Sequence, residues 1–196
     1  MARPLSEAKR IALLEAAVGE IAFDGLGAVT AKIAKAAGVA SGTLFVYFPT
    51  KDDLFNQLYI HLKQEILKCV MEDYPKGAPV EEQYQHFWNR YIEWGSHTPE
   101  KLKVLRQLTA SEKLTYASRS AAWQAFSDVH DMLTEGFNTG VLREQPLDFL
   151  GGVMDAIASL VLERIEREPR KIEEYTLLGW QAFWGAISLS RVESIE

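Results

Sequence analysis

Apolar side chains recur at helical spacing along almost the whole chain. In residues 51–73 they follow one another at intervals of four, at Leu54, Leu58, Leu62, Ile66 and Val70. This spacing places them on one face of a long helix. The prolines fall where one such pattern stops and the next begins, because proline cannot continue a helix: Pro4, Pro49, Pro75, Pro79, Pro99, Pro146 and Pro169. The pattern predicts an all-α chain without strands and with about nine helices, over residues 5–24, 30–37, 41–47, 51–73, 80–97, 100–114, 118–139, 147–168 and 171–193.

Residues 30–51 read as two short helices joined by a tight turn. Gly38 follows a short apolar helical pattern, so we expect it to adopt the left-handed conformation that ends a helix. Leu44 and Phe48 are four residues apart and face inward in the second helix, which leaves Thr43 and Tyr47 on its outer side. This arrangement is a helix-turn-helix, whose second helix enters a groove of DNA. The alternative is a plain helical hairpin in an all-helical protein.

The ends of these helices carry candidate caps. Thr30 is expected to cap the first short helix and to offer its hydroxyl to a phosphate, and Ser41 is expected to cap the second. Thr50 and Asp53 form a Thr-x-x-Asp start for the long helix that begins at Lys51. A cation at a helix N-terminus opposes the helix dipole, so Lys51 predicts an anion nearby.

In this region the chain resembles the TetR family (TetR/AcrR type) of one-component repressors. The resemblance covers residues 9–59 and is carried by Thr30, Ile33, Ala34, Ala37, Gly38, Val39, Gly42, Thr43, Leu44, Tyr47, Phe48, Lys51 and Leu54, with the first-helix positions Ile11, Leu14, Ala16, Ala17, Phe23 and Gly25. It implies an N-terminal three-helix DNA-binding head, residues 1–50. A long helix joins that head to a helical ligand-binding and dimerisation body, residues 51–196. The implied DNA contacts are Thr30, Lys32, Ser41, Gly42, Thr43, Tyr47 and Lys51.

Two positions depart from the family pattern. Ala40 stands where a capping serine is usual, and Phe45 where a tyrosine usually donates to phosphate. We expect Phe45 to lie in the core.

The charge is unevenly distributed along the chain. The 196 residues carry a net charge of −6. Residues 1–51 hold six basic and four acidic side chains, a net charge of +2, while the remainder holds fifteen basic and twenty-three acidic, a net charge of −8. The basic end is therefore predicted to face DNA. Because +2 is weakly basic, binding as a dimer is expected.

The cysteine and histidine content and the lengths of the apolar runs argue against several classes of protein. The single cysteine, Cys69, excludes an internal disulfide and a CxxC motif. The four histidines lack the spacing of a helical metal site, so no metal and no cofactor are expected. No run is as long as a membrane span, and Met1–Arg10 lacks a secretory apolar core, so we expect a cytoplasmic protein with no membrane partner.

The body is rich in aromatic residues. Tyr84, Phe87, Trp88, Tyr91 and Trp94 follow i, i+3, i+4, i+7 spacing and form an inward-facing stripe. Such a stripe is typical either of a hydrophobic core or of the wall of a ligand pocket. The family resemblance implies a ligand cavity, and we take as its wall candidates Trp88, Tyr91, Trp123, Phe126 and His130.

The last two helices carry apolar residues on more than one face and small residues that allow close helix approach. We predict a two-fold dimer interface there, formed by Met154, Ile157, Val161, Trp180, Phe183, Trp184 and Ile187. The alternative is a wholly intramolecular helical hairpin.

The resulting hypothesis is a homodimeric repressor that a small, largely apolar ligand releases from a palindromic double-stranded operator. Repression rather than activation rests on the family resemblance alone. Two alternatives remain open at this point. One is a helical-bundle enzyme using His86, His97 and Glu93. The other is an architectural DNA-binding protein that responds to no effector.

Overall fold

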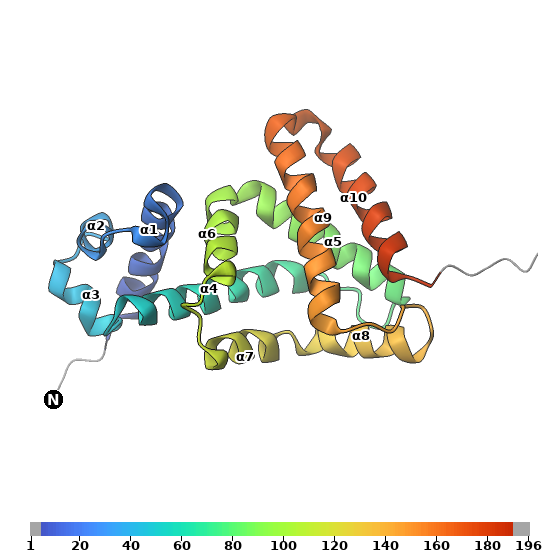
Figure 1. Cartoon of the computed structure of the whole chain (residues 1–196), viewed down its shortest axis with the longest axis horizontal. Helices are drawn as coiled ribbons and strands as arrows, with labels where there is room; N and C mark the ends of the chain where they lie inside the picture. Colours follow the sequence, from blue (N-terminus) through green and yellow to red (C-terminus); the bar gives the residue numbers. More distant parts are fainter. Residues whose placement is uncertain (1–4, 190–196) are drawn as a thin grey trace, which may run out of the picture. The chain divides into compact units, whose positions relative to one another are not determined.

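The computed structural model describes residues 5–189 and is all-α over that range, as predicted. The described residues form ten α-helices (Figure 1), two short 3-10 helices and one isolated β-bridge, Leu142–Ser188. The α-helices are α1 Glu7–Asp24, α2 Thr30–Ala36, α3 Ser41–Tyr47, α4 Lys51–Met71, α5 Val80–His97, α6 Pro99–Ala110, α7 Tyr116–Ala125, α8 Ser127–Asn138, α9 Leu147–Arg167 and α10 Ile172–Ile187; the 3-10 helices are η1 Gly25–Gly27 and η2 Pro169–Lys171.

Three predicted helices differ from those observed. The helix expected over 118–139 is two helices, because the backbone leaves the helical region at Phe126, with φ −91° and ψ 35°. The helix expected over 100–114 ends at Ala110, before the extended Ser111. The last helix ends at Ile187, and residues 190–193 of its predicted span lie outside the described range.

The described chain forms two compact units. One comprises residues 5–67 and 98–125, and the other residues 68–97 and 126–189. Helix α4 begins in the first unit and ends in the second. The assignment of DNA binding to residues 1–50, and of ligand binding and dimerisation to residues 51–196, stays a prediction.

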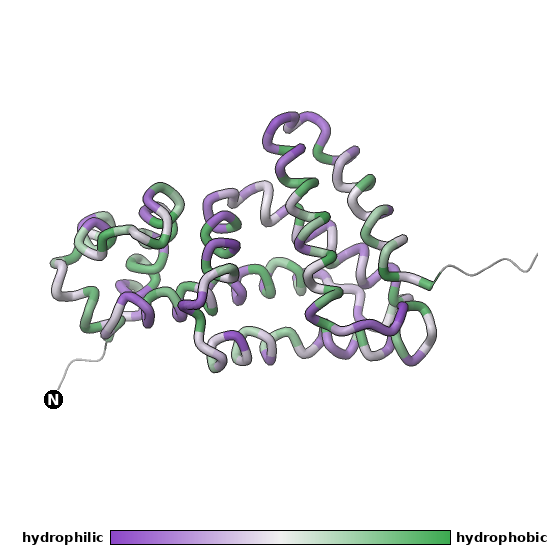
Figure 2. The backbone as a smooth tube through the Cα atoms, in the orientation of Figure 1, coloured by the Kyte–Doolittle hydropathy of each residue, from purple (hydrophilic) through white to green (hydrophobic). Residues whose placement is uncertain are grey.

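The core of the first unit contains the predicted apolar face of α4. Leu54, Leu58 and Leu62 are fully buried, together with Leu13 and Leu14 of α1. Figure 2 shows hydrophobic and hydrophilic residues alternating along the helices, as one-sided burial requires. No helix within residues 5–189 combines the length and the apolar character needed to cross a bilayer.

The core of the second unit is built on the aromatic stripe of α5, all of which is buried as predicted. Helices α9 and α10 form an adjacent pair (Figure 1), and both pack against α5. Trp88 stacks on Phe183 of α10 at 5.5 Å between ring centroids, and its Nε1 donates to the carbonyl of Thr176 at 2.9 Å. Trp88 is therefore a core residue whose polar atom is satisfied inside the protein.

Candidate nucleic-acid interface

The turn between α2 and α3 has the predicted form. Gly38 adopts φ +69°, and the N–H of Val39 donates to the carbonyl of Ala34 at 3.0 Å. This left-handed residue reverses the chain within a few positions, and α2 packs against both α1 and α3. The three helices form the helix-turn-helix that was predicted (Figure 1).

The two side-chain caps predicted in this motif are wrong. Thr30 and Ser41 are the first residues of α2 and α3, and the residues in the cap positions are Val29 and Ala40. A cap must precede the first helical residue, and valine and alanine have no acceptor to offer, so neither helix start has a side-chain cap bond. The hydroxyls of Thr30 and Ser41 are thus not used for capping.

The predicted capping pair at the start of α4 is confirmed. The N–H of Asp53 donates to Thr50 Oγ1 at 3.0 Å, and the N–H of Thr50 donates to Asp53 Oδ2 at 3.0 Å. The ammonium of Lys51 lies 5.5 Å from the centroid of the Phe55 ring. These contacts define the start of α4 and hold the lysine beside it.

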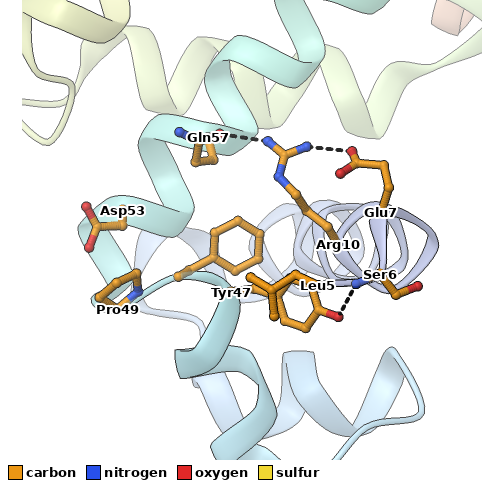
Figure 3. Close-up of a pocket in the computed structure, with 9 residues that line it drawn as sticks. Leu5, Ser6, Glu7, Arg10, Tyr47, Pro49, Asp53 and Gln57 are labelled. Atoms are coloured by element: carbon orange, nitrogen blue, oxygen red, sulfur yellow. Dashed lines mark hydrogen bonds and ion pairs between the residues drawn. The ribbon is translucent and has the colours of Figure 1, made fainter. Parts of the chain in front are cut away.

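Tyr47, at the end of α3, is held against the start of α1. Its hydroxyl accepts a hydrogen bond from the N–H of Ser6 at 3.1 Å (Figure 3). A phenol that accepts one bond still has its own proton to donate. The ring borders a cavity of about 410 Å³ lined by Leu5, Ser6, Glu7, Arg10, Tyr47, Phe48, Pro49, Asp53 and Gln57.

The cation that borders this cavity is already paired. Arg10 donates to Glu7 at 2.9 Å and to Gln57 at 2.7 Å (Figure 3). The same cavity is lined by the carboxylate of Asp53. These contacts orient the elements around Tyr47, and they leave no net positive charge there to attract an anion.

Lys32 of α2 carries its charge at the surface but has a partner within the protein. Its Nζ lies 2.9 Å from Asp24 Oδ2, and the hydrogen bond to that carboxylate raises the pKa of the lysine. A phosphate would have to replace Asp24 as its partner.

The outer face of α3 differs from its predicted composition. Leu44 and Phe48 are fully buried as expected, and Ser41 and Gly42 are exposed. Phe45 is 46% exposed and Val46 is 60% exposed. The expectation that Phe45 lies in the core is wrong, because a seven-residue helix buries only the edge that carries Leu44 and Phe48. The spacing of those two residues is the signal that assigns positions 45 and 46 to the outside.

A charged cluster joins three helices of the first unit. Lys101 Nζ lies 3.0 Å from Glu15 Oε1 and 2.8 Å from Glu65 Oε1, and His61 Nε2 lies 3.1 Å from the same oxygen of Glu15. Burial works to raise the pKa of Glu15, but the hydrogen bonds from Lys101 and His61 outweigh it and the pKa is lowered. This cluster was not predicted from the sequence, although the His61–Glu65 spacing of four residues was a signal for it.

The cluster also brings together the ligand types of a metal site. Glu15, His61 and Glu65 each offer an atom within 4.8 Å of the others. The ammonium of Lys101 lies against both carboxylates and supplies the positive charge that they require. The expectation of no metal stays a prediction.

The ligand-wall candidates lie in different parts of the chain. Trp88 and Tyr91 are buried in the second unit, and Tyr91 donates to Asp155 at 3.5 Å. Phe126 and His130 are half-buried in that unit, and burial lowers the pKa of His130. Trp123, which is 47% exposed, belongs to the first unit. Their role in ligand binding stays a prediction.

Most of the dimer candidates face the interior of the protomer. Val161, Trp180, Phe183 and Ile187 are buried in the second unit, and only Met154, Ile157 and Trp184 are half-buried. The buried four pack in their own chain, because α9 and α10 pack against each other and both pack against α5. The exposed large apolar side chains of α9 and α10 are instead Leu147, Phe149, Leu160, Leu177 and Leu178.

The residues named as possible catalytic groups of a helical-bundle enzyme form hydrogen bonds or ion pairs within the protein. His86 Nε2 lies 3.1 Å from the carbonyl oxygen of Val70, and His97 Nδ1 lies 2.9 Å from that of Glu93. The carboxylate of Glu93 pairs with Arg90 at 2.7 Å. The three groups are hydrogen-bonded separately and do not form a catalytic arrangement with one another.

The chain matches known proteins in both sequence and fold. Residues 13–58 match the family model described as "Bacterial regulatory proteins, tetR family". An uncharacterised HTH-type transcriptional regulator of Haemophilus influenzae is 32% identical over 76 residues, which are 39% of this chain and 41% of that protein. The chain thus spans less than half of that relative's length. The fatty acid metabolism regulator protein of Bacillus subtilis is 26% identical over 139 residues, 69% of this chain and 72% of that protein.

Solved structures share the fold over nearly their whole length. A tetR family transcription regulator structure from Shewanella sp. PV-4 has a TM-score of 0.83 at 23% identity and covers 92% of this chain and 98% of that one. The regulator FadR from Bacillus subtilis, solved with stearoyl-CoA, has a TM-score of 0.69 at 19% identity and covers 91% of this chain and 99% of that one. All of these relatives are named as regulators, and three of them as regulators of transcription.

Proposed function

We propose that the chain is a DNA-binding transcription regulator of the TetR family, and that it acts in the cytoplasm as a homodimeric repressor that a small, largely apolar ligand releases from a palindromic operator. The observation that carries the proposal is the exposed face of α3 within a helix-turn-helix that matches the family model.

The proposed DNA contacts fall into two groups. Ser41, Gly42 and Thr43 lie on the first turn of α3, where side chains of a recognition helix meet base edges. Tyr47 has a hydroxyl proton left to donate, and Lys51, the first residue of α4, is half-buried with its ammonium over the Phe55 ring. We assign these two, with Thr30 and Lys32, to phosphates, which position the protein without reading sequence.

The proposed dimer uses the exposed side of α9 and α10, supported by both apolar and small residues. Phe149 and Leu160 are exposed there. Gly152 and Gly185 lie inside helices, yet a Cβ at either position would meet nothing within 4 Å. Glycine inside a helix costs about 0.5–1 kcal/mol relative to alanine, and nothing in the protomer uses the space. Close approach by a second copy would use it.

Such a dimer would set two copies of α3 about one DNA turn apart, roughly 34 Å, and so predicts a palindromic operator. The variant Gly152→Leu, which fills the space, is expected to give monomers. Sedimentation at micromolar concentration measures this, and an unchanged dimer would contradict the proposed interface.

The proposed effector is a small compound with a large apolar part, such as an acyl chain. It is supported by the aromatic composition of the second unit and by the likeness to a fatty acid metabolism regulator. Release requires that the ligand bind the DNA-free state more tightly than the DNA-bound state. Helix α4, which runs from one unit into the other, is the element that would transmit the change.

Fluorescence anisotropy tests the proposal directly. The full-length protein is titrated onto DNA from immediately upstream of its own gene, and onto a scrambled duplex of equal length, at near-physiological salt. Tight binding to the first alone supports a sequence-specific regulator, whereas equal and weak binding to both argues against an operator at that place. Adding fatty acyl compounds to the complex then tests release, and an affinity that no compound changes favours an architectural protein.

A further inference from the structure

We propose that Phe45 and Val46 read thymine methyl groups in the major groove, so that A·T pairs are recognised by apolar contact as well as by hydrogen bonds. The inference rests on the proposed function and names a feature of the DNA that α3 recognises. It assigns a role to two residues that the sequence did not suggest as DNA contacts.

The first observation is the orientation of the two side chains. Each residue of an α-helix turns by about 100°, so Val46 lies half a turn from Leu44 and Phe48. Those two are fully buried, while Val46 is exposed and Phe45 lies beside it at the edge of the outer face. About half of the Phe45 surface and more than half of the Val46 surface is not covered by the protomer, so both side chains expose apolar area to water.

The second observation is the open surface around them. Gly42 precedes Val46 by one helical turn, and a Cβ at position 42 would meet nothing within 4 Å. Its φ is not in the left-handed region, so the backbone does not require glycine there. Because glycine has no side chain, the outer face of α3 leaves open space next to Val46, and another molecule can approach the backbone closely there.

The third observation selects DNA as that molecule. Groups that suit phosphates border the apolar pair, namely the Tyr47 hydroxyl and the Lys51 ammonium. A protein-binding surface has no need of phosphate donors at its edge, whereas a recognition helix does. Within the major groove the apolar feature is the C5-methyl of thymine, which accepts contact from phenylalanine and small aliphatic groups.

Uracil substitution isolates this contact, because it removes the methyl group and keeps every base-pairing atom. A duplex is first selected from a random-sequence pool by the full-length protein. Each thymidine of that duplex is then replaced in turn by deoxyuridine, and affinity is measured by anisotropy. We expect about a fourfold loss at one or two positions of each half-site, the effect of one methyl group removed from water.

The variants Phe45→Ala and Val46→Ala complete the test. At least one of them should bind the thymidine and deoxyuridine duplexes equally, with an unchanged salt dependence and an unchanged melting temperature. Phe23→Ala is the matched control, because Phe23 is an exposed phenylalanine of the same unit that lies on α1. It should keep the full thymidine preference.

The outcomes separate this inference from the proposed function. Sequence-specific binding that ignores every uracil substitution, or a selected half-site without an A·T pair, overturns the methyl contact and leaves the regulator intact. A methyl effect that survives in both alanine variants overturns the assignment to these residues. If the pool yields no preferred sequence, the proposed function and the inference fail together.

Discussion

Helices α5 and α3 both carry large apolar side chains, but those of α5 are buried whereas two of those of α3 are exposed. On α5 every aromatic of the stripe is buried, and Trp88 has both a stacking partner and a hydrogen-bond acceptor inside the chain. On α3 the apolar residues Phe45 and Val46 face solvent beside an open glycine. A buried stripe has its contacts within the protein, whereas exposed apolar side chains are available for contact with another molecule. The contrast separates residues that build the fold from residues available for binding.

The largest expected effect is at Gly179 of α10, which packs against the buried aromatic residues of α5. A Cβ there would lie 2.6 Å from Trp88 Cζ2 and would also overlap Val161 Cγ2, and both of these side chains are buried. Gly179→Ala is expected to destabilise the protein by about 3 kcal/mol through overpacking. Thermal unfolding followed by circular dichroism measures this, with a fall in melting temperature of roughly 10 °C.

Gly19→Ala is the control, because Gly19 lies inside α1 and a Cβ there meets nothing within 4 Å. It should gain about 0.5–1 kcal/mol. Equal effects of the two alanines would mean that α10 does not pack against Trp88 as described.

The charged cluster of the first unit gives the next largest effect. Lys101→Met removes the cation that neutralises Glu15 and Glu65, and is expected to cost about 2 kcal/mol at pH 7. The folded-state pKa of Glu15 is lowered, so its contribution is present above the unfolded value of 4.5 and is lost as the pH falls through the folded value. The difference between wild type and variant should therefore shrink from pH 7 to pH 4.

Denaturant unfolding at both pH values measures that difference. Lys113→Met is the matched control, because Lys113 and Asp52 form a pair in which each side chain is 53% exposed. Such surface pairs contribute little, so this variant should be nearly neutral at both pH values. A pH-independent loss in Lys101→Met would show that packing, not charge, accounts for its effect.

Among the proposed DNA contacts, Lys51 gives the next effect: Lys51→Glu should weaken binding by about tenfold for every DNA sequence alike. A lost phosphate contact also lowers the slope of log affinity against log salt concentration by about 0.9. Titrations of the selected and scrambled duplexes at several salt concentrations measure both quantities. Lys68→Glu, at the other end of α4, is the control and should change neither. A loss confined to one sequence would assign Lys51 to base reading.

The smallest expected effect is at Gly42, and it has opposite signs for folding and binding. Gly42→Ala should stabilise the protein by about 0.5–1 kcal/mol, because the new methyl group has room and helical glycine is unfavourable. It should also weaken binding to the selected duplex severalfold, because the methyl group occupies the space that DNA would use. Stabilisation with unchanged affinity would indicate that DNA does not approach α3 at this position.

Much of the head could be predicted from residues that are neighbours in the chain. Gly38 ends α2, the Thr50–Asp53 pair starts α4, and both work through hydrogen bonds spanning a few residues. The limits of α3 and α5 agreed with the predicted 41–47 and 80–97. The buried face of α4 followed from spacing alone, because a helix repeats every 3.6 residues wherever it lies.

The sequence by itself determined the all-α class, the helix-turn-helix and the inward stripes of α4 and α5, since each depends on a local repeat or a local cap. Only the tertiary structure decided that Phe183 and Ile187 are core residues and that Lys101 meets Glu15 across 86 positions of chain. A repeat shows that a helix has an apolar face. Which neighbour covers that face depends on contacts between residues distant in sequence, and no spacing along the chain encodes them.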